Sequence, residues 1–341
     1  MKIVYLEPRS SYRNNLRSDT LWGLICWGIK TVFSEQKLEE FIEEHKEKPV
    51  KISSVFPFKV NSKDSNKKKL FFPRPILQPL NLNHFFESKG IDKKSERAQF
   101  IADLKKFKKV KFVEKSTFEK FLEGELNETE FFLNKSLWEK ENDFFKKEDI
   151  LHNSINRLTN TTYSSSDDKR ASLYSTTETY ISNGGLFFLI DGTPEQIELI
   201  EASLRFYSHV GFGGDSSIGK GYFKISVDDC ELPKSDNSDA FVTLSLFLPN
   251  DDELAEFQND KSRVWYELEA RKGKFGGQFV KINRFWKESV LMFKEGSVFP
   301  NLNKSFYGKI KTVMSQEENG MFDVYHYGVA FDLPIKLKRE D

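Results

Sequence analysis

The first sixty residues combine two strand patterns with one helical pattern. The run Ile3 to Glu7 predicts a first β-strand. Residues 18–32 predict a helix, because apolar side chains recur every three or four positions behind Ser18-Asp19-Thr20, which we expect to cap it. The segment Lys51 to Val60 predicts a second strand, and Pro57 favours its placement at a sheet edge or its early end, since proline cannot donate to a strand ladder.

A long interruption separates these elements from three more. Residues 61 to about 180 hold a lysine-rich loop, two helical patterns and a polar stretch rich in Ser, Thr and Tyr, and we interpret them as an insertion. After it, Leu186 to Ile190 predicts a buried strand, and Thr193 to Gln196 predicts a capping box that begins a helix. Tyr222 to Val227 has the composition of a final strand. The helical patterns in the insertion centre on Phe100, Leu104 and Phe107 and on Phe118, Phe121 and Leu122.

The order of these elements predicts an α+β fold of two domains. Without the insertion the order is strand, helix, strand, strand, helix, strand, which is the ferredoxin-like (RRM-like) arrangement, over residues 1–230 with the insertion at about 61–180. Apolar alternation restarts at residues 241–248, and we interpret residues 239–341 as a second, degenerate ferredoxin-like domain with its own glycine loop, Gly273 to Gly277. Its further expected strands are residues 264–270, 289–293, 306–313 and 322–332.

Five glycines in eleven residues, from Gly211 to Gly221, lie between the second predicted helix and the last strand. The spacing Gly214 to Lys220 has most of a Walker A loop, but that loop needs a preceding strand, a following helix and a hydroxyl after the lysine. Here the element order is reversed and glycine follows the lysine, so we reject triphosphate hydrolysis. Consecutive glycines let backbone amides point into one concavity that binds phosphate oxygens, although a glycine-rich turn without a ligand explains the same residues. The candidate phosphate-binding residues are Gly213, Gly214, Ser216, Ser217 and Lys220.

Length and cysteine usage indicate the class of protein. With 341 residues, of which 38% are hydrophobic, the chain is long enough for two domains with cores of their own. Cys26 and Cys230 are far apart in sequence and Cys26 lies in an apolar run, which favours a reducing compartment over a disulfide. The start from Met1 to Leu6 lacks the apolar core of a signal peptide, and no later run approaches the length of a membrane span. We expect a cytoplasmic protein with no membrane partner.

Charge is balanced overall but segregated along the chain. The formal net charge is zero, which argues against binding nucleic acid by bulk electrostatics alone. Separate basic and acidic surfaces are typical of a subunit that contacts RNA and a protein neighbour, although solvated faces explain each run by itself. The basic runs are residues 59–74, 105–111 and 336–339, and the acidic runs are residues 35–47, 119–130 and 228–239. The sequence has no Cys-x-x-Cys, no His-x-x-x-His and no dense carboxylate cluster, so we expect no metal and no other cofactor.

The glycine loop carries a resemblance to a known family. A loop of the form Gly-x-Gly-Gly-x-x-x-x-Gly-Lys-Gly after the last helix of a ferredoxin-like domain resembles the RAMP superfamily, the repeat-associated proteins of CRISPR effector complexes. Within it, Ser18 to Trp27, His152 to Thr161 and Leu333 to Lys336 are similar to segments of the fourth subunit of the type III-A (Csm) complex. The resemblance spans the chain. The loop alone is specific only to the superfamily, whereas the loop and the first two segments in this order are more specific.

The resemblance implies a non-catalytic subunit that caps the crRNA at its repeat-derived 5′ tag. The implied partners are the crRNA 5′ tag, the large polymerase-like subunit and an adjacent backbone RAMP subunit. Carried over by position, the tag contacts fall on the five glycine-loop residues named above, on Arg157 of the Asn-Arg-x-Thr element, and on Arg17 at the end of the polar loop 8–17. The stretch Tyr163 to Tyr180 is implied to be an arm that wedges against the guide duplex. The role of residues 61–150 stays open.

Some alternatives stay open beside this interpretation. Tyr163, Tyr174 and Tyr180 are candidates for base stacking, but tyrosines are also ordinary strand residues. RAMP folds also process crRNA, commonly with a histidine in acid–base cleavage, which makes a metal-independent endonuclease the main rival function. His209 lies beside the glycine loop and His152 precedes the Asn-Arg-x-Thr element, yet no histidine lies between Ser18 and Trp27, where such enzymes often carry one. A protein-only assembly scaffold is a third possibility, and it requires the glycine loop to serve packing alone.

Overall fold

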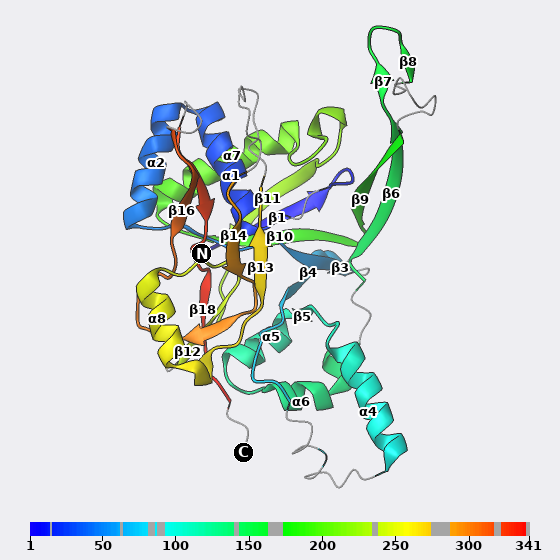
Figure 1. The fold of residues 1–341 in the computed structure, drawn as a ribbon, viewed down its shortest axis with the longest axis vertical. Helices are drawn as coiled ribbons and strands as arrows, with labels where there is room; N and C mark the ends of the chain where they lie inside the picture. The colour runs from blue at the N-terminus through cyan, green and yellow to red at the C-terminus, as the bar shows by residue number, and fades with distance from the viewer. Residues whose placement is uncertain are drawn as a thin grey trace.

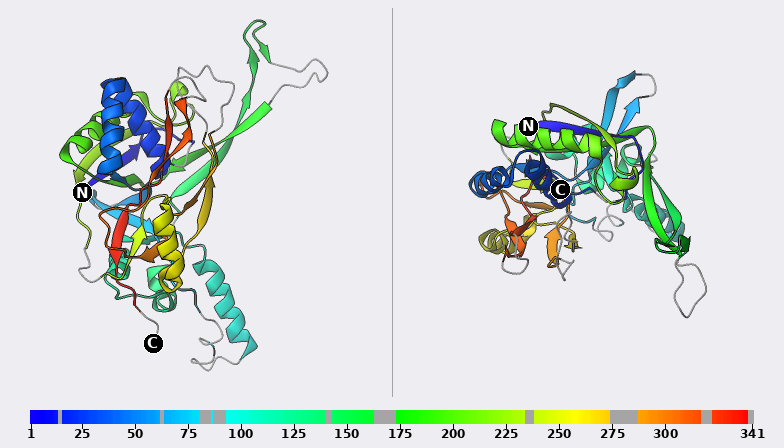
Figure 2. Two further views of the ribbon diagram at one scale, coloured as in Figure 1. Left: turned by 60° about the vertical axis from the view of Figure 1, so that its left-hand side comes forward. Right: turned by 90° about the horizontal axis from the view of Figure 1, so that it is seen from above.

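The computed structural model describes residues 1–13, 16–61, 64–80, 86, 93–139, 143–162, 173–233, 238–273, 287–316 and 322–338. Figures 1 and 2 show a body of mixed helices and strands from which a long β-hairpin projects. Within these ranges every helix is too short or too polar to cross a lipid bilayer.

A seven-stranded antiparallel sheet lies at the centre of the body (Figure 1). Its strand order is β11-β1-β10-β3-β4-β5, and β2 also pairs with β10. The four strands predicted for the first domain therefore stand in the order fourth, first, third, second. The strands are β1 (Lys2–Pro8), β2 (Lys51–Ile52), β3 (Phe56–Asn61), β4 (Asp64–Pro73), β5 (Phe112–Glu114), β10 (Gly184–Asp191) and β11 (Phe223–Asp229).

The sheet is covered on both faces, because successive side chains of a strand point to opposite sides. In β1, Val4 and Leu6 pack in a core shared with three helices. Ile3 packs in a different core that includes residues of the insertion and of the C-terminal half. The three helices are α1 (Ser18–Val32), α2 (Glu35–Glu47) and α7 (Pro194–Val210).

Helix α1 spans the predicted residues, but its expected cap has another role. The N-cap residue is Arg17, which makes no side-chain cap bond. The hydroxyl of Ser18 is buried and accepts a 3.0 Å hydrogen bond from the backbone N–H of Leu246 in the C-terminal half. The prediction of a Ser18 cap is therefore wrong, because the second half of the chain presents an unpaired amide that takes this acceptor.

The second predicted strand is interrupted and lies inside the sheet. It divides into β2 and β3, and β3 lies between β10 and β4, so the edge position predicted from Pro57 is wrong. Pro57 is opposite Leu186 of β10, whereas the β4 ladder starts only at Phe58. The missing amide of Pro57 therefore costs no hydrogen bond on the β4 side.

The insertion contains the two predicted helical patterns but also extends the sheet. Residues 64–73, expected within a lysine-rich loop, form β4, which pairs with β3 as a hairpin. Pairing supplies the backbone bonds, and the ammonium group of Lys68 lies 3.7 Å from the ring centre of Tyr5, a cation–π contact. The helices of the insertion are α4 (Lys94–Phe107), α5 (Lys115–Leu122), α6 (Glu128–Leu133) and the 3₁₀ turn η1 (Lys135–Leu137).

A two-stranded hairpin forms the arm that Figures 1 and 2 show projecting from the body. Strands β6 (Phe145–Asn153) and β9 (Leu173–Ile181) pair along their whole length, from Phe145 opposite Ile181 to Asn153 opposite Leu173. The short strands β7 (Ile155–Asn156) and β8 (Thr161–Thr162) continue it to the tip. The implied arm is therefore present in residues 173–180, while Tyr163 lies outside the described residues.

The C-terminal half has several strands near the predicted positions but a different arrangement. Its described strands divide among one three-stranded sheet, β15-β12-β18, and two hairpins, β13-β14 and β16-β17. This arrangement does not confirm a second ferredoxin-like sheet. Helix α8 (Asp251–Asn259) was not predicted, although Asn250 and Glu253 form a capping box there. The strands are β12 (Ala240–Thr243), β13 (Leu268–Arg271), β14 (Val290–Phe293), β15 (Val298–Pro300), β16 (Ile310–Met314), β17 (Val324–Tyr327) and β18 (Asp332–Ile335), and η3 (Lys261–Arg263) follows α8.

Candidate nucleic-acid interface

The glycine loop has the structural context that the sequence predicts. Helix α7 begins with a capping box between Thr193 and Gln196, with Pro194 at its first turn, and ends at Gly211. A 3₁₀ turn, η2 (Ser216–Ile218), follows, and then β11. The order helix, loop, strand is confirmed, and it is the reverse of a Walker A loop.

Glycine is required at several positions of this loop for steric reasons. Gly211, Gly213, Gly219 and Gly221 all have positive φ. A Cβ atom on Gly221 would lie 1.9 Å from the carbonyl oxygen of Phe212. The loop therefore has a fixed, strongly curved backbone. Asp215, which is not a glycine, also has a positive φ of 64°.

Five consecutive backbone amides at the centre of the loop, from residue 213 to residue 217, donate to no described protein group. The amides that follow are used: Ile218 and Lys220 donate to the carbonyl of Asp215 at 3.1 and 3.2 Å. The hydroxyls of Ser216 and Ser217 likewise make no hydrogen bond within the described residues, and Ser217 is exposed. Successive free amides in a turn whose residues alternate between right-handed and left-handed backbone conformations form a concavity that binds anions.

Lys220 is held by the root of the arm. Its ammonium group donates to Glu178 of β9 at 2.8 Å, and Ser11 and Tyr180 donate to the same carboxylate oxygen at 2.6 and 3.1 Å. Glu178 is only 2% exposed. The hydrogen bond from Lys220 is the main reason that the pKa of Glu178 is lowered, and the same bond raises the pKa of Lys220. The charge of Lys220 is thus balanced inside the protein, and Tyr180 has a polar partner.

The N-terminal loop 8–17 supports the glycine loop from the other side. Arg13 pairs with Asp215, which neutralises the carboxylate beside the free amides. Ser11 accepts from the amide of Gly221 through its carbonyl at 2.8 Å. Arg9 donates its backbone amide to Tyr222 at 2.8 Å, and its exposed guanidinium has no ion pair within the described residues. Arg9 and Arg13 were not predicted as RNA contacts, although they recur every four residues together with Arg17.

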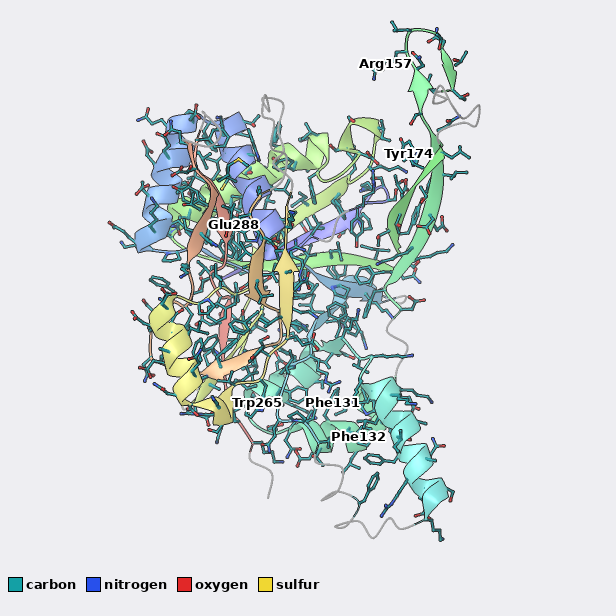
Figure 3. All side chains as sticks on the ribbon, viewed as in Figure 1. Phe131, Phe132, Arg157, Tyr174, Trp265 and Glu288 are labelled. Atoms are coloured by element: carbon teal, nitrogen blue, oxygen red, sulfur yellow. The ribbon has the colours of Figure 1, made fainter. Side chains whose placement is uncertain are left out.

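Arg157 lies far along the arm, in the turn between β7 and β8 (Figure 3). It is exposed and has no ion pair with any described residue. The same tip exposes large apolar side chains, among which Leu158 is 95% exposed. Tyr174 stacks on His152 across the two strands, with ring centres 5.2 Å apart, so one face of each ring is already covered. The structure therefore places Arg157 at the tip of the arm and the glycine loop on the body.

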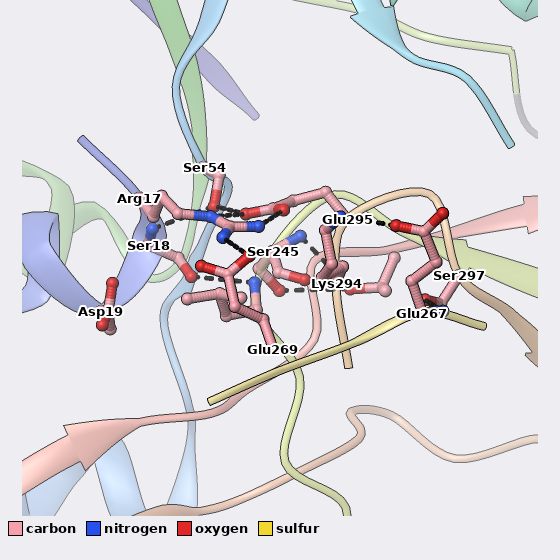
Figure 4. A network of polar contacts seen from close by, with 12 residues as sticks. Arg17, Ser18, Asp19, Ser54, Ser245, Glu267, Glu269, Lys294, Glu295 and Ser297 are labelled. Atoms are coloured by element: carbon pink, nitrogen blue, oxygen red, sulfur yellow. Dashed lines mark hydrogen bonds and ion pairs between the residues drawn. The ribbon is translucent and has the colours of Figure 1, made fainter. Parts of the chain in front are cut away.

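Arg17 occupies the junction between the two halves of the chain (Figure 4). Its guanidinium donates to Glu295, with Nε at 2.9 Å from Oε1, and also pairs with Glu269. Burial disfavours the charged form, but these two carboxylates outweigh it and raise the pKa of Arg17. A structural ion pair thus occupies this side chain, and its contact with RNA stays a prediction.

The two histidines considered for cleavage are separated by the fold. His209 is exposed in the last turn of α7, next to the glycine loop. His152 lies on β6, where its Nε2 is 2.8 Å from the hydroxyl of Thr176. No hydrogen bond or ring contact joins the two among the described residues. In the same part of the chain, no group of three or more His, Cys, Asp and Glu side chains is arranged to hold a metal ion.

Comparisons with known proteins agree with this geometry. Residues 8–224 match the RAMP superfamily, and residues 236–335 match the CRISPR Csm4 C-terminal domain. The chain is 25% identical over 309 residues to the CRISPR system Cms protein Csm4 of Streptococcus thermophilus, covering 89% of this chain and 85% of that protein. It is 24% identical over 336 residues to the protein of the same name from Thermococcus onnurineus, covering 98% and 96%.

Solved structures show the same fold. A chain of the crystal structure of the Csm1-Csm4 cassette in complex with cA4 matches with a TM-score of 0.62 at 19% identity, covering 99% of both chains. A chain of the Csm3-Csm4 subcomplex of the type III-A interference complex matches with a TM-score of 0.59 at 20% identity, covering 98% of this chain and 100% of that one. Since the superfamily match covers more than half of the chain, this protein belongs to the RAMP superfamily and, within it, is similar to Csm4.

Proposed function

We propose that this chain is a non-catalytic subunit of a type III-A CRISPR effector complex and binds the 5′ repeat-derived tag of crRNA. The row of free amides at residues 213–217 is the observation that carries the proposal. Five donors on a backbone fixed by glycines suit phosphate oxygens, which accept hydrogen bonds from any direction and need no base sequence. A subunit assembled on crRNA would act in the cytoplasm.

The proposed tag site consists of Gly213, Gly214, Ser216, Ser217 and Lys220. The amides and the two serine hydroxyls would donate to one or two phosphates, and Lys220 would supply positive charge at the edge of the site. Because Glu178 already balances the charge of Lys220, the amides would carry most of the interaction with phosphate. We add Arg9, whose guanidinium has no ion pair within the described residues and whose backbone amide bonds to Tyr222.

The proposal assigns different roles to the two remaining arginines. Arg157 would contact the RNA backbone from the tip of the arm, where no described carboxylate competes for it. Arg17 would act through position, because its pairs with Glu269 and Glu295 hold the N-terminal loop that carries Ser11 and Arg13.

We infer the partners from the relatives. Proteins similar to this chain were solved as a Csm1-Csm4 cassette and as a Csm3-Csm4 subcomplex. By analogy, this chain would link the large polymerase-like subunit to the adjacent backbone RAMP subunit. We also infer that residues 1–230 form a ferredoxin-like domain, which the strand order fourth, first, third, second supports, and that residues 239–341 form a second unit.

The decisive experiment removes access to the amides without removing a charge. Gly214→Val places a branched side chain at a loop position that does not have positive φ, so it imposes no left-handed strain on the backbone. We expect at least a tenfold loss of affinity of the full chain for the tag RNA, with an unchanged melting temperature. Gly23→Val is the matched control, because a Cβ at Gly23 meets no atom within 4 Å and lies on α1.

Two results would contradict the proposal. Normal tag affinity in a folded Gly214→Val protein would show that the amides of residues 213–217 do not bind the tag. Cleavage of crRNA precursor by the full chain, abolished by His209→Ala, would replace the binding subunit with the endonuclease, since His209 is the exposed histidine next to the loop.

A further inference from the structure

The insertion contains a cavity at the root of the arm, which we call the arm-root cavity. Its volume is about 350 Å³, a size at which proteins bind small ligands and single bases. It opens between the end of α4, strand β5, the segment after η1 and the start of β6, the region around the lower end of the arm in Figure 1. The cavity is lined by Lys106, Lys109, Val110, Lys111, Phe112, Trp138, Glu139, Phe144 and Phe145.

The rim of the cavity is positively charged. Lys106, Lys109 and Lys111 are all exposed, and none of them has an ion pair within the described residues. The nearest upstream carboxylate, Asp103, pairs with Lys135 at 2.6 Å and also interacts electrostatically with Lys106. Among the described residues that line the cavity, Glu139 is the one acidic residue, so three cations stand against one anion there. The uncompensated charge favours an anionic ligand.

The walls of the cavity are aromatic and rigidly packed. Phe144 is buried and meets Phe71 and Phe112 edge-on, with ring centres 4.7 and 5.9 Å apart. Phe112 and Phe145 are half-buried, so part of each ring is accessible. Such rings offer stacking surfaces that need no rotamer change on binding.

Among the described lining residues, no neutral side chain has a free polar group that could read a base. The indole N–H of Trp138 is the one neutral side-chain donor among the lining residues, and it already donates to the carbonyl of Phe132 at 2.9 Å. Recognition therefore depends on stacking against the aromatic walls and on the positive charge of the rim. That combination is typical of single-stranded nucleic acid bound without sequence preference.

We propose that the arm-root cavity binds one unstacked base of a single-stranded RNA, while Lys106, Lys109 and Lys111 contact the flanking phosphates. A free nucleotide would gain only one phosphate contact, whereas three lysines along one rim match the successive phosphates of a strand. Phe145 is the first residue of β6, so this site lies at the opposite end of the arm from Arg157. The inference rests on the proposed function only in taking RNA as the ligand, and it shares no residue with the glycine loop.

The test compares two pairs of lysines on the same segment. Lys109→Ala/Lys111→Ala removes charges at the cavity, and Lys105→Ala/Lys108→Ala removes two exposed charges from the same run that do not line it. The measurement is the affinity of the full chain for decauridine RNA in a salt series. We expect the cavity pair to lower the log–log salt slope by about 1.4, at about 0.7 per phosphate contact on single strands, and the control pair to leave it unchanged.

A second measurement reports stacking. A 2-aminopurine base within the RNA loses fluorescence when it stacks on a ring, and Phe112→Leu keeps the apolar volume while it removes the aromatic face. We expect Phe112→Leu to reduce this quenching severalfold in a protein with an unchanged melting temperature. Decathymidine DNA serves as a second probe, since binding of both oligomers assigns the site to single strands in general.

The outcomes separate this inference from the proposed function. Equal effects of the two lysine pairs, or unchanged quenching in folded Phe112→Leu, would overturn the cavity site. Binding of an oligoglutamate peptide in place of RNA would overturn it in favour of a protein partner. Gly214→Val should leave decauridine binding at the cavity intact while it reduces tag affinity, so each site can fail without the other.

Discussion

The junction between the two halves and the projecting arm use charged residues in opposite ways. At the junction, two arginines have protein partners: Arg17 pairs with Glu269 and Glu295, and Arg271 donates two bonds to Asp19 at 2.9 and 3.1 Å. At the tip of the arm, Arg157 has no ion pair within the described chain. Buried charges must be paired to be tolerated, whereas exposed charges are cheap to leave free.

Apolar side chains show the same contrast. Tyr327 is fully buried at the junction, where its hydroxyl accepts from Ile52 at 2.8 Å and donates to Val50 at 3.1 Å. On the arm, Leu151, Ile155 and Leu158 are all more than 60% exposed. A monomer gains nothing from such exposure, so the arm has the composition of a surface that is covered on assembly. The apolar side chains of the junction are therefore buried within the chain, whereas those of the arm are exposed.

The largest expected loss of stability comes from removing the charge of Arg17 at the junction. Arg17→Met keeps the aliphatic stem but leaves two carboxylates without their cation, and Glu295 is largely buried. Removing one partner of a buried ion pair costs about 3–5 kcal/mol, and the partial exposure of Glu269 favours the lower end. We expect urea unfolding to show a loss of about 3 kcal/mol.

The triple variant Arg17→Met/Glu269→Gln/Glu295→Gln is the control, and it should recover much of that loss because no unpaired charge remains. A stable Arg17→Met protein with a reduced salt slope for tag RNA would reverse the assignment and make Arg17 an RNA contact.

A second prediction uses the pH dependence of the junction. His45 is 1% exposed beside Trp22 and Tyr327, and burial lowers its pKa to about 3. Because its unfolded pKa is about 6.5, the unfolded state binds the extra proton. The contribution of His45 to stability is complete above pH 6.5 and should fall by about 1.4 kcal/mol per pH unit below it, down to pH 3.

Urea unfolding of the wild type and of His45→Gln at pH 7.0 and pH 5.5 measures this effect. The wild type should lose about 1.4 kcal/mol more than the variant over that interval. Parallel losses in the two proteins would show that His45 is protonated in the folded state.

The third prediction compares the two cations that we propose contact phosphate, and it includes the smallest expected change in stability. Lys220→Met leaves the buried carboxylate of Glu178 without its strongest donor and should lower the melting temperature. Arg157→Ala removes no described contact, so the free energy of unfolding should change by less than about 0.5 kcal/mol. Each variant should lower the salt slope for tag RNA by about 0.7.

A salt slope unchanged in both variants would refute the phosphate contacts of both residues. A lowered melting temperature for Arg157→Ala would instead assign that arginine a structural role on the arm. The thermal melt and the salt series together therefore decide whether each cation has a structural role or contacts phosphate.

The local pattern of the chain predicted the elements that depend on neighbouring residues. The capping box at Thr193 and Gln196, the helix–loop–strand order around the five glycines, and the helical patterns of α4 and α5 were all predicted, because capping, positive φ and amphipathic periodicity are local properties. The segment 64–73 was not, since its lysines mask a strand that becomes stable only through pairing with β3.

The sequence by itself determined that a glycine turn joins the last helix of the first predicted domain to its last strand and that the chain resembles the RAMP superfamily. Only the tertiary structure decided which charges are free. Arg17, Lys220 and Arg157 look alike in sequence, yet the first is held by two carboxylates 252 and 278 positions away, the second by Glu178, and the third by none that the structure describes. Electrostatic partners are set by distance in space, which chain separation does not encode, so the fold alone distinguishes a cation that is paired within the described chain from one that is not.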